Sequence, residues 1–115
     1  MVSELAKDLS ISVLMDFYGE LLTPKQLEAL DSYYNQDLSL AEIAEEMEVS
    51  RQGVRNFIKT GEQHLADFEE KLSLAERFIT VNKIADEIAE IIKNLPEGDI
   101  KVSLLSQIDR IKSQL

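Results

Sequence analysis

The chain has 115 residues, of which 44% are hydrophobic and 30% charged, and its formal net charge at pH 7 is −10. This length suits one modest domain with a hydrophobic core, and the lack of cysteine excludes disulfides and thiolate nucleophiles. No run approaches the ~18 apolar residues of a membrane span, and "MVSELAKDLS" lacks a basic segment followed by an apolar one, so we expect a cytoplasmic protein.

Apolar residues recur at intervals of three and four along the whole chain, which predicts an all-α fold. The first predicted helix covers residues 2–22. Its inward stripe repeats every four residues: Leu5, Leu9, Val13, Phe17 and Leu21. Thr23 is expected to cap a second helix that runs to about Tyr34. Pro24 suits the first position of that helix, and Gln26 completes a capping box.

Two further capping signals surround a short turn. Ser39 and Glu42 form a second capping box, which predicts a helix over residues 39–47. Ser50 is expected to cap the next helix, and the small Ala44 allows the two helices to cross closely. Glu48 lies where such turns usually have glycine, which predicts a strained or slightly shifted turn. The pattern is that of a helix-turn-helix.

Hydrogen-bond donors occupy the outer side of the second helix of this motif. The candidate nucleic-acid-binding residues are Ser50, Arg51, Gln52, Arg55, Asn56 and Lys59. Donors in the first turns of such a helix meet phosphates and base edges. Residues 50–60 contain basic residues and no acid, although the acidic remainder of the chain opposes tight nonspecific binding to DNA. The alternative is a helical hairpin with a solvated polar face.

A longer apolar pattern follows and predicts one helix over residues 62–94, about 50 Å long at 1.5 Å per residue. "NLPEGD" ends this helix, and a last amphipathic helix over residues 100–115 folds back on it. One short helix leaves part of the apolar stripe uncovered, so we predict a homodimer; the alternative is an intramolecular bundle. The candidate dimerisation residues are Leu65, Phe68, Leu72, Ala75 and Ile79.

Catalytic and metal chemistry find little support in the sequence. Adjacent acidic residues such as Glu45 and Glu46 point apart on a helix, and there is no glycine-rich phosphate loop or nucleophile elbow. His64 is the only histidine and is expected to be a solvated surface residue. We therefore predict a binding protein, not an enzyme, with no catalytic residues, no metal and no cofactor.

The stretch "LLTPKQLEALDSYYNQDLSLAEIAEEMEVSRQGVRNFIKTGEQHL" resembles the DNA-contacting C-terminal helix-turn-helix of bacterial sigma factors. It is similar, more closely still, to the YlxM-like proteins, and this resemblance covers residues 17–72. Gly53 stands where that family commonly has alanine. The resemblance implies a regulatory or accessory role in the signal recognition particle pathway, with the particle's RNA or its GTPases as partners.

The elements and the resemblance together predict a single all-α domain over residues 1–115. Residues 1–60 would form the N-terminal helices and the helix-turn-helix of the sigma-factor type, and residues 61–115 the long helix and the C-terminal helix used for dimerisation. Two functions stay open. One is the signal recognition particle regulator, and the other is a dimeric sigma-like transcription regulator with Arg51, Gln52 and Arg55 in the major groove of duplex DNA.

Overall fold

A computed structural model describes residues 10–115, and this part of the chain contains helices and turns but no strand, which confirms the all-α prediction. Its contacts gather into two compact units, residues 10–75 and Glu76–Leu115. This division falls later along the chain than residue 60. The single domain over residues 1–115 stays a prediction, and each unit is described by itself.

The first helices of the first unit begin at capping residues. α2 (Ile11–Tyr18) follows Ser10, whose hydroxyl accepts a hydrogen bond from the Val13 N–H, and a 3₁₀ turn (Gly19–Leu21) continues it. The helix predicted over residues 2–22 is wrong in its bounds, because Ser10 has an extended backbone and caps α2, and Leu21, predicted to face inward, is exposed. The part of the predicted helix before Ser10 lies outside the described residues. α3 (Pro24–Leu30) begins with the predicted capping box, in which the Gln26 N–H donates to Thr23 Oγ1 at 3.2 Å and the Thr23 N–H to Gln26 Oε1 at 3.1 Å. A π-helical turn (Asp31–Asn35) extends α3.

The helix-turn-helix has the turn geometry that usually requires glycine. α4 (Leu40–Met47) begins with the predicted Ser39–Glu42 capping box and ends at Glu48, which has φ 58° and ψ 41°. The Val49 N–H donates to the Ala44 carbonyl at 3.1 Å and the Glu48 N–H to the Glu45 carbonyl at 3.3 Å, which is the Schellman pattern. The turn is therefore regular, not shifted, and Glu48 carries the predicted strain in its left-handed backbone.

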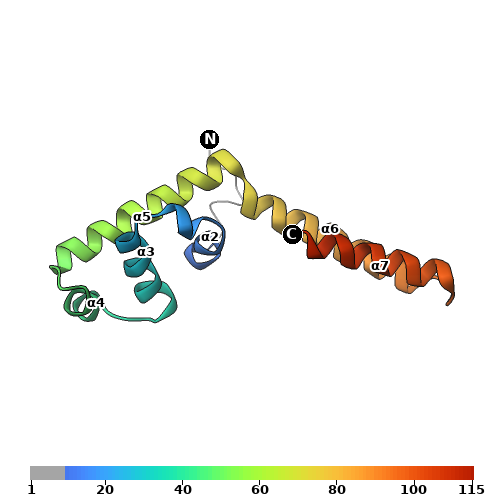
Figure 1. Ribbon diagram of the computed structural model, residues 1–115, viewed down its shortest axis with the longest axis horizontal. Helices are drawn as coiled ribbons and strands as arrows, with labels where there is room; N and C mark the ends of the chain where they lie inside the picture. The colour runs from blue at the N-terminus through green and yellow to red at the C-terminus, as the bar shows by residue number, and fades with distance from the viewer. Residues whose placement is uncertain (1–9) are drawn as a thin grey trace. The chain divides into compact units, whose positions relative to one another are not determined.

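α5 (Arg51–Leu72) is the helix against which the other helices of this unit pack (Figure 1). It begins at the predicted cap, where the Gly53 N–H donates to Ser50 Oγ at 3.0 Å. Gly61 allows α3 to approach closely, because a Cβ there would lie 2.7 Å from Leu30 Cδ1. The core of the unit consists of Leu14, Met15, Tyr18, Leu22, Ala29, Leu30, Ile43, Ala44, Val54, Ile58, Leu65 and Ala75.

The single long helix predicted over residues 62–94 is wrong. α5 ends at Leu72, Ser73 takes a left-handed conformation with φ 54°, and α6 (Leu74–Lys93) begins. The first two N–H groups of α6 are bound by side chains of the core: that of Leu74 donates to Tyr18 Oη, and that of Ala75 to Glu69 Oε1, both at 3.0 Å. These side chains stabilise a new helix start that the apolar spacing does not reveal.

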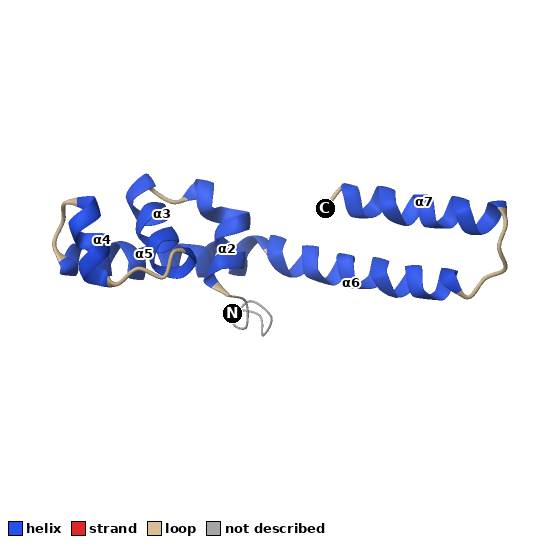
Figure 2. Ribbon diagram, turned by 90° about the horizontal axis from the view of Figure 1, so that it is seen from below, coloured by secondary structure: helices blue, strands red, loops and turns tan. Residues whose placement is uncertain are grey.

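The second unit is a hairpin in which α7 (Asp99–Ser113) returns antiparallel to α6, as predicted (Figure 2). Gly98, with φ 150°, supplies the backbone conformation that precedes α7. The hairpin's core is small: Ala85, Ile92 and Ile108 are buried, and Ala89 and Leu105 pack against them. Polar contacts also join the helices, because Lys101 Nζ donates to the Lys93 carbonyl at 3.1 Å and Lys112 pairs with Asp86.

Candidate nucleic-acid interface

The structure brings the six candidate nucleic-acid-binding residues together at the start of α5. Ser50 is the N-cap, Arg51 and Gln52 lie in the first turn, and the others follow at a spacing of four residues, which keeps them on one side of the helix. All six side chains are exposed. We call Arg51, Gln52, Arg55, Asn56 and Lys59 the α5 face, since the Ser50 hydroxyl is occupied by the Gly53 N–H.

The opposite side of the same helical turns holds the α5 face in place. Val54 and Ile58 are buried in the core of the first unit, and Phe57 packs against it. On the face itself, Gln52 Nε2 donates to Asn56 Oδ1 at 3.2 Å, so the two amides are already ordered one turn apart. The backbone under the polar side chains is thus fixed by packing, which limits the conformational entropy lost on binding a ligand.

The charge of the α5 face is basic. Within residues 10–115, Arg51, Arg55 and Lys59 form no ion pair, whereas Lys93, Lys101 and Lys112 of the second unit each pair with a carboxylate. The two guanidinium groups can each donate two parallel hydrogen bonds to a phosphate, and the ammonium group acts as a point charge. This face is equipped to bind an anionic chain.

A cavity of ≈ 270 Å³ lies beside the α5 face; its lining consists of Tyr33, Tyr34, Leu40, Arg55, Ile58, Lys59 and Glu62. The Tyr33 and Tyr34 rings meet edge to face, with centroids 5.1 Å apart. Tyr34 Oη donates a hydrogen bond to Glu62 Oε1. Burial, and then this hydrogen bond, raise the pKa of Tyr34 to about 12.

The sequence predicts neither tyrosine as a site residue and places both in the last turn of the second predicted helix, which runs to about Tyr34. In the structure Tyr33 is 39% and Tyr34 40% exposed. Their adjacency is no signal of exposure, because the adjacent Leu14 and Met15 are both buried in the core of the same unit.

The candidate dimerisation residues do not form one exposed seam. Leu65 and Ala75 are fully buried in the core of their own chain, and Phe68 packs against that core, so the first two have no surface to offer a partner. Leu72, at the end of α5, is 45% exposed, and Ile79 is half-buried in α6 beyond the break at Ser73. The homodimer itself stays a prediction.

His64 is exposed, as predicted, with its Nδ1 3.5 Å from Gln26 Nε2 and its ring 6.4 Å from that of Phe68. Between residues 10 and 115 no three side chains of His, Asp or Glu gather in a way that would hold a metal ion. No helix in the same range is both long and apolar enough to cross a membrane.

Two helices joined by a Schellman turn, the second with an exposed polar face, define a helix-turn-helix protein. A family profile described as "Putative helix-turn-helix protein, YlxM / p13 like" matches residues 5–104, and the chain belongs to this family. The match continues past Leu72, where the resemblance noted in the sequence ended. α6 and the start of α7 are therefore part of the family pattern.

Individual relatives agree with this assignment. The chain is 41% identical over 104 residues to the UPF0122 protein of Acetivibrio thermocellus, covering 90% of this chain and 89% of the relative. It is 42% identical over 106 residues to the UPF0122 protein of Streptococcus mutans, covering 92% and 96%. The UPF0122 protein of Clostridium kluyveri is 48% identical over 85 residues, covering 74% and 77%.

Proposed function

We propose that this protein is a non-enzymatic helix-turn-helix protein that binds nucleic acid through the α5 face. The observation that supports the proposal is the arrangement of Arg51, Arg55 and Lys59. These cations lie on successive turns of one helix, exposed and free of ion pairs within the described residues, while Val54 and Ile58 anchor the helix from behind. Residues 50–60 contain these basic side chains and no acid, in a chain whose formal net charge is −10.

The chemistry of each side chain assigns it a role. Arg51 and Arg55 bind phosphates or guanine edges, because a guanidinium matches two acceptors at once. Gln52 and Asn56 can exchange their mutual hydrogen bond for the donor and acceptor of an adenine edge. Lys59, one turn further, contacts the backbone. The net charge of −10 repels the remainder of a long duplex, so we expect weak binding to plain duplex DNA at physiological salt.

We place this binding in an accessory or regulatory role in the signal recognition particle pathway, in the cytoplasm, with the particle's RNA or its GTPases as the partners. The resemblance to the YlxM-like proteins implies this role, and the match to the YlxM / p13-like helix-turn-helix family supports that resemblance. The α5 face is suited to an RNA partner, and the remaining helical surface to a protein partner.

A second candidate function is a dimeric sigma-like transcription regulator. The observation that favours it is the regular Schellman turn, which places Arg51 and Gln52 in the first turn of the second helix, where helix-turn-helix proteins contact bases in the major groove. Sequence-selective binding of duplex DNA that survives physiological salt would favour this candidate over the first.

A salt titration with two variants tests the proposal. Binding to signal recognition particle RNA and to duplex DNA is measured at increasing salt, where phosphate contacts give a steep linear fall of log K with log salt. Arg51→Glu with Arg55→Glu should abolish binding while the helical circular dichroism is kept. Arg77→Glu with Arg110→Glu makes the same change of charge on exposed residues of α6 and α7. Equal loss in both double variants would mean that net charge, not the α5 face, governs binding.

A further inference from the structure

We infer that the cavity beside the α5 face receives an unpaired nucleobase, so that this protein prefers nucleic acid with a bulged, looped or single-stranded nucleotide to a continuous duplex. The inference rests on the proposed nucleic-acid binding and names the class of ligand for it. It adds Tyr33 and Tyr34 to the interface.

The cavity combines aromatic, apolar and basic groups from three elements of the first unit. Tyr33 and Tyr34 come from the π-helical turn and Leu40 from α4, while Arg55 and Lys59 come from α5. Its volume is ≈ 270 Å³. Extra turns of π-helix are rare and often lie at functional sites, and here the turn presents two neighbouring aromatic side chains at the surface.

The exposed rings supply a stacking surface. Tyr33 and Tyr34 are 39% and 40% exposed, and each touches the other edge to face, so ring surface of both is accessible to a ligand. Every base has a π face that stacks on an aromatic side chain, whatever its sequence. A base inside a duplex is already stacked and paired, whereas a bulged or single-stranded base is free to enter the cavity.

The basic groups bind the rest of the same nucleotide. Arg55 and Lys59 belong both to the cavity lining and to the α5 face, so a strand whose phosphates lie on that face has its next base at the cavity. A duplex presents phosphates to the two cations but no free base to the tyrosines. An unpaired nucleotide binds the cations through its phosphate and the tyrosines through its base. We therefore expect it to bind more tightly than a nucleotide in a duplex.

Glu62, the acid in the cavity lining, is compatible with this ligand. Its Oε1 accepts the hydrogen bond from Tyr34 Oη, which fixes the tyrosine ring at its outer end. The carboxylate retains a second oxygen, an acceptor of the kind that meets the amino groups of cytosine, adenine or guanine. The carboxylate thus acts as an orienting group at the end of the cavity and favours a base there over a phosphate.

The test compares probes that differ only in pairing. A blunt RNA duplex, the same duplex with a single-nucleotide bulge, and one of its single strands are titrated at one salt concentration, with DNA versions of all three. The bulged and single-stranded probes should bind about tenfold more tightly than the blunt duplex, in line with the usual contribution of one base–aromatic stack. If only the RNA probes show this preference for unpaired nucleotides, the ligand is RNA. If the DNA probes show it equally, the ligand is any strand with an unpaired nucleotide.

Variants assign the preference to the cavity. Tyr33→Leu and Tyr34→Leu should bring the affinity for the bulged probe down to that for the blunt duplex, and Tyr34→Phe, which keeps the ring, should retain the preference. Leu21→Ala removes an apolar side chain that is 58% exposed and outside the cavity, and it should change nothing. Tyrosine emission offers a direct signal, because the chain has no tryptophan and the third tyrosine, Tyr18, is buried.

Equal affinity for blunt and bulged probes, unchanged by the tyrosine variants, would overturn this inference and leave binding by the α5 face intact. Failure of every probe to bind would overturn the proposed function and the inference with it. Circular dichroism of each variant checks that the helices are retained.

Discussion

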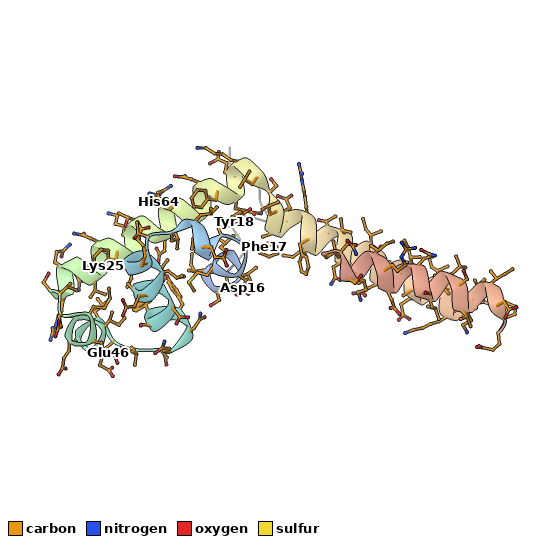
Figure 3. All side chains as sticks on the ribbon, viewed as in Figure 1. Asp16, Phe17, Tyr18, Lys25, Glu46 and His64 are labelled. Carbon is orange, nitrogen blue, oxygen red and sulfur yellow. The ribbon has the colours of Figure 1, made fainter. Side chains whose placement is uncertain are left out.

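Tyr18 Oη donates a 2.5 Å hydrogen bond to Glu69 Oε1 in the core of the first unit, which joins α2 to the last turns of α5. Figure 3 shows the Tyr18 side chain on the side of α2 that faces α5. The same two oxygens accept the N–H groups of Leu74 and Ala75 at the start of α6. One buried pair therefore stabilises both the packing of α2 and the beginning of the next helix.

Loss of the Tyr18 hydroxyl should destabilise the protein by about 1–3 kcal/mol, because Tyr18→Phe leaves buried hydrogen-bonding groups of Glu69 and Leu74 without this partner. Glu69→Leu should cost a similar amount. Urea unfolding of both single variants and the double variant measures the coupling between them. Additive losses would show that the two side chains act independently.

The same hydrogen bond makes the stability of the folded protein depend on pH in the alkaline range. Burial, and then the hydrogen bond to Glu69, raise the pKa of Tyr18 from 10.0 to about 12. The folded state thus keeps the phenol proton at a pH where the unfolded chain releases it. The stabilisation is complete below pH 10 and is lost as the pH rises toward about 12. Melting temperatures across this range should fall less steeply in Tyr18→Phe than in the unmodified protein.

Local signals of the sequence determine how the helices of the first unit begin. The capping residues Thr23, Ser39 and Ser50 each accept the hydrogen bond that the sequence predicts, because a cap depends on residues only three positions away. The α5 face follows from the same local periodicity. The sequence therefore predicts the helix-turn-helix and the exposure of the candidate nucleic-acid-binding residues.

The remaining features depend on contacts between residues distant in the sequence. The break at Ser73 is stabilised in part by Tyr18, which lies 56 positions before Leu74, and the spacing of apolar residues cannot show such a contact. Leu65 and Ala75 fit a helical stripe, but only the packing of α2 and α3 on α5 shows that they belong to the core. The cavity at Tyr33 depends equally on α5, which supplies most of its other lining residues.

Replacing Glu48 by glycine should stabilise the protein by about 1 kcal/mol, because glycine adopts the left-handed conformation at φ 58° without the steric cost that a Cβ imposes. Glu48→Ala retains that cost and is the matched control for the loss of the carboxylate. Thermal or urea unfolding measures both. An equal gain in the two variants would attribute the effect to charge and not to backbone strain.

Gly61→Ala should destabilise the protein even though alanine favours helix by about 1 kcal/mol. The added Cβ would lie 2.7 Å from Leu30 Cδ1, and Leu30 is fully buried, so its side chain can move aside only by shifting its neighbours in the core. Overpacking of this kind costs about 1–3 kcal/mol. Leu30→Ala removes the clashing atom, so Gly61→Ala should cost less in that background. Stabilisation by Gly61→Ala in the unmodified protein would contradict the close approach of α3 and α5.

The core of the α6–α7 hairpin, which consists of Ala85, Ile92 and Ile108, is small for the independent stability of a helical pair. Large aliphatic side chains remain exposed on both helices, among them Ile91 at 68% and Ile100 at 76%. We expect a second copy of the hairpin to cover such residues, which gives a particle of twice 13.0 kDa by light scattering.

Ile91→Lys with Ile100→Lys should yield monomers that keep their helical spectrum, because charged groups in the contact between copies would lack partners while the hairpin's own core stays unchanged. Leu72→Lys tests the one candidate dimerisation residue of the first unit that is well exposed. Ala41→Lys, on the exposed side of α4, adds the same charge away from the hairpin and should leave the dimer intact. A monomeric mass for the unmodified protein at tens of micromolar would refute the dimer and leave the hairpin's aliphatic surface to a different protein partner.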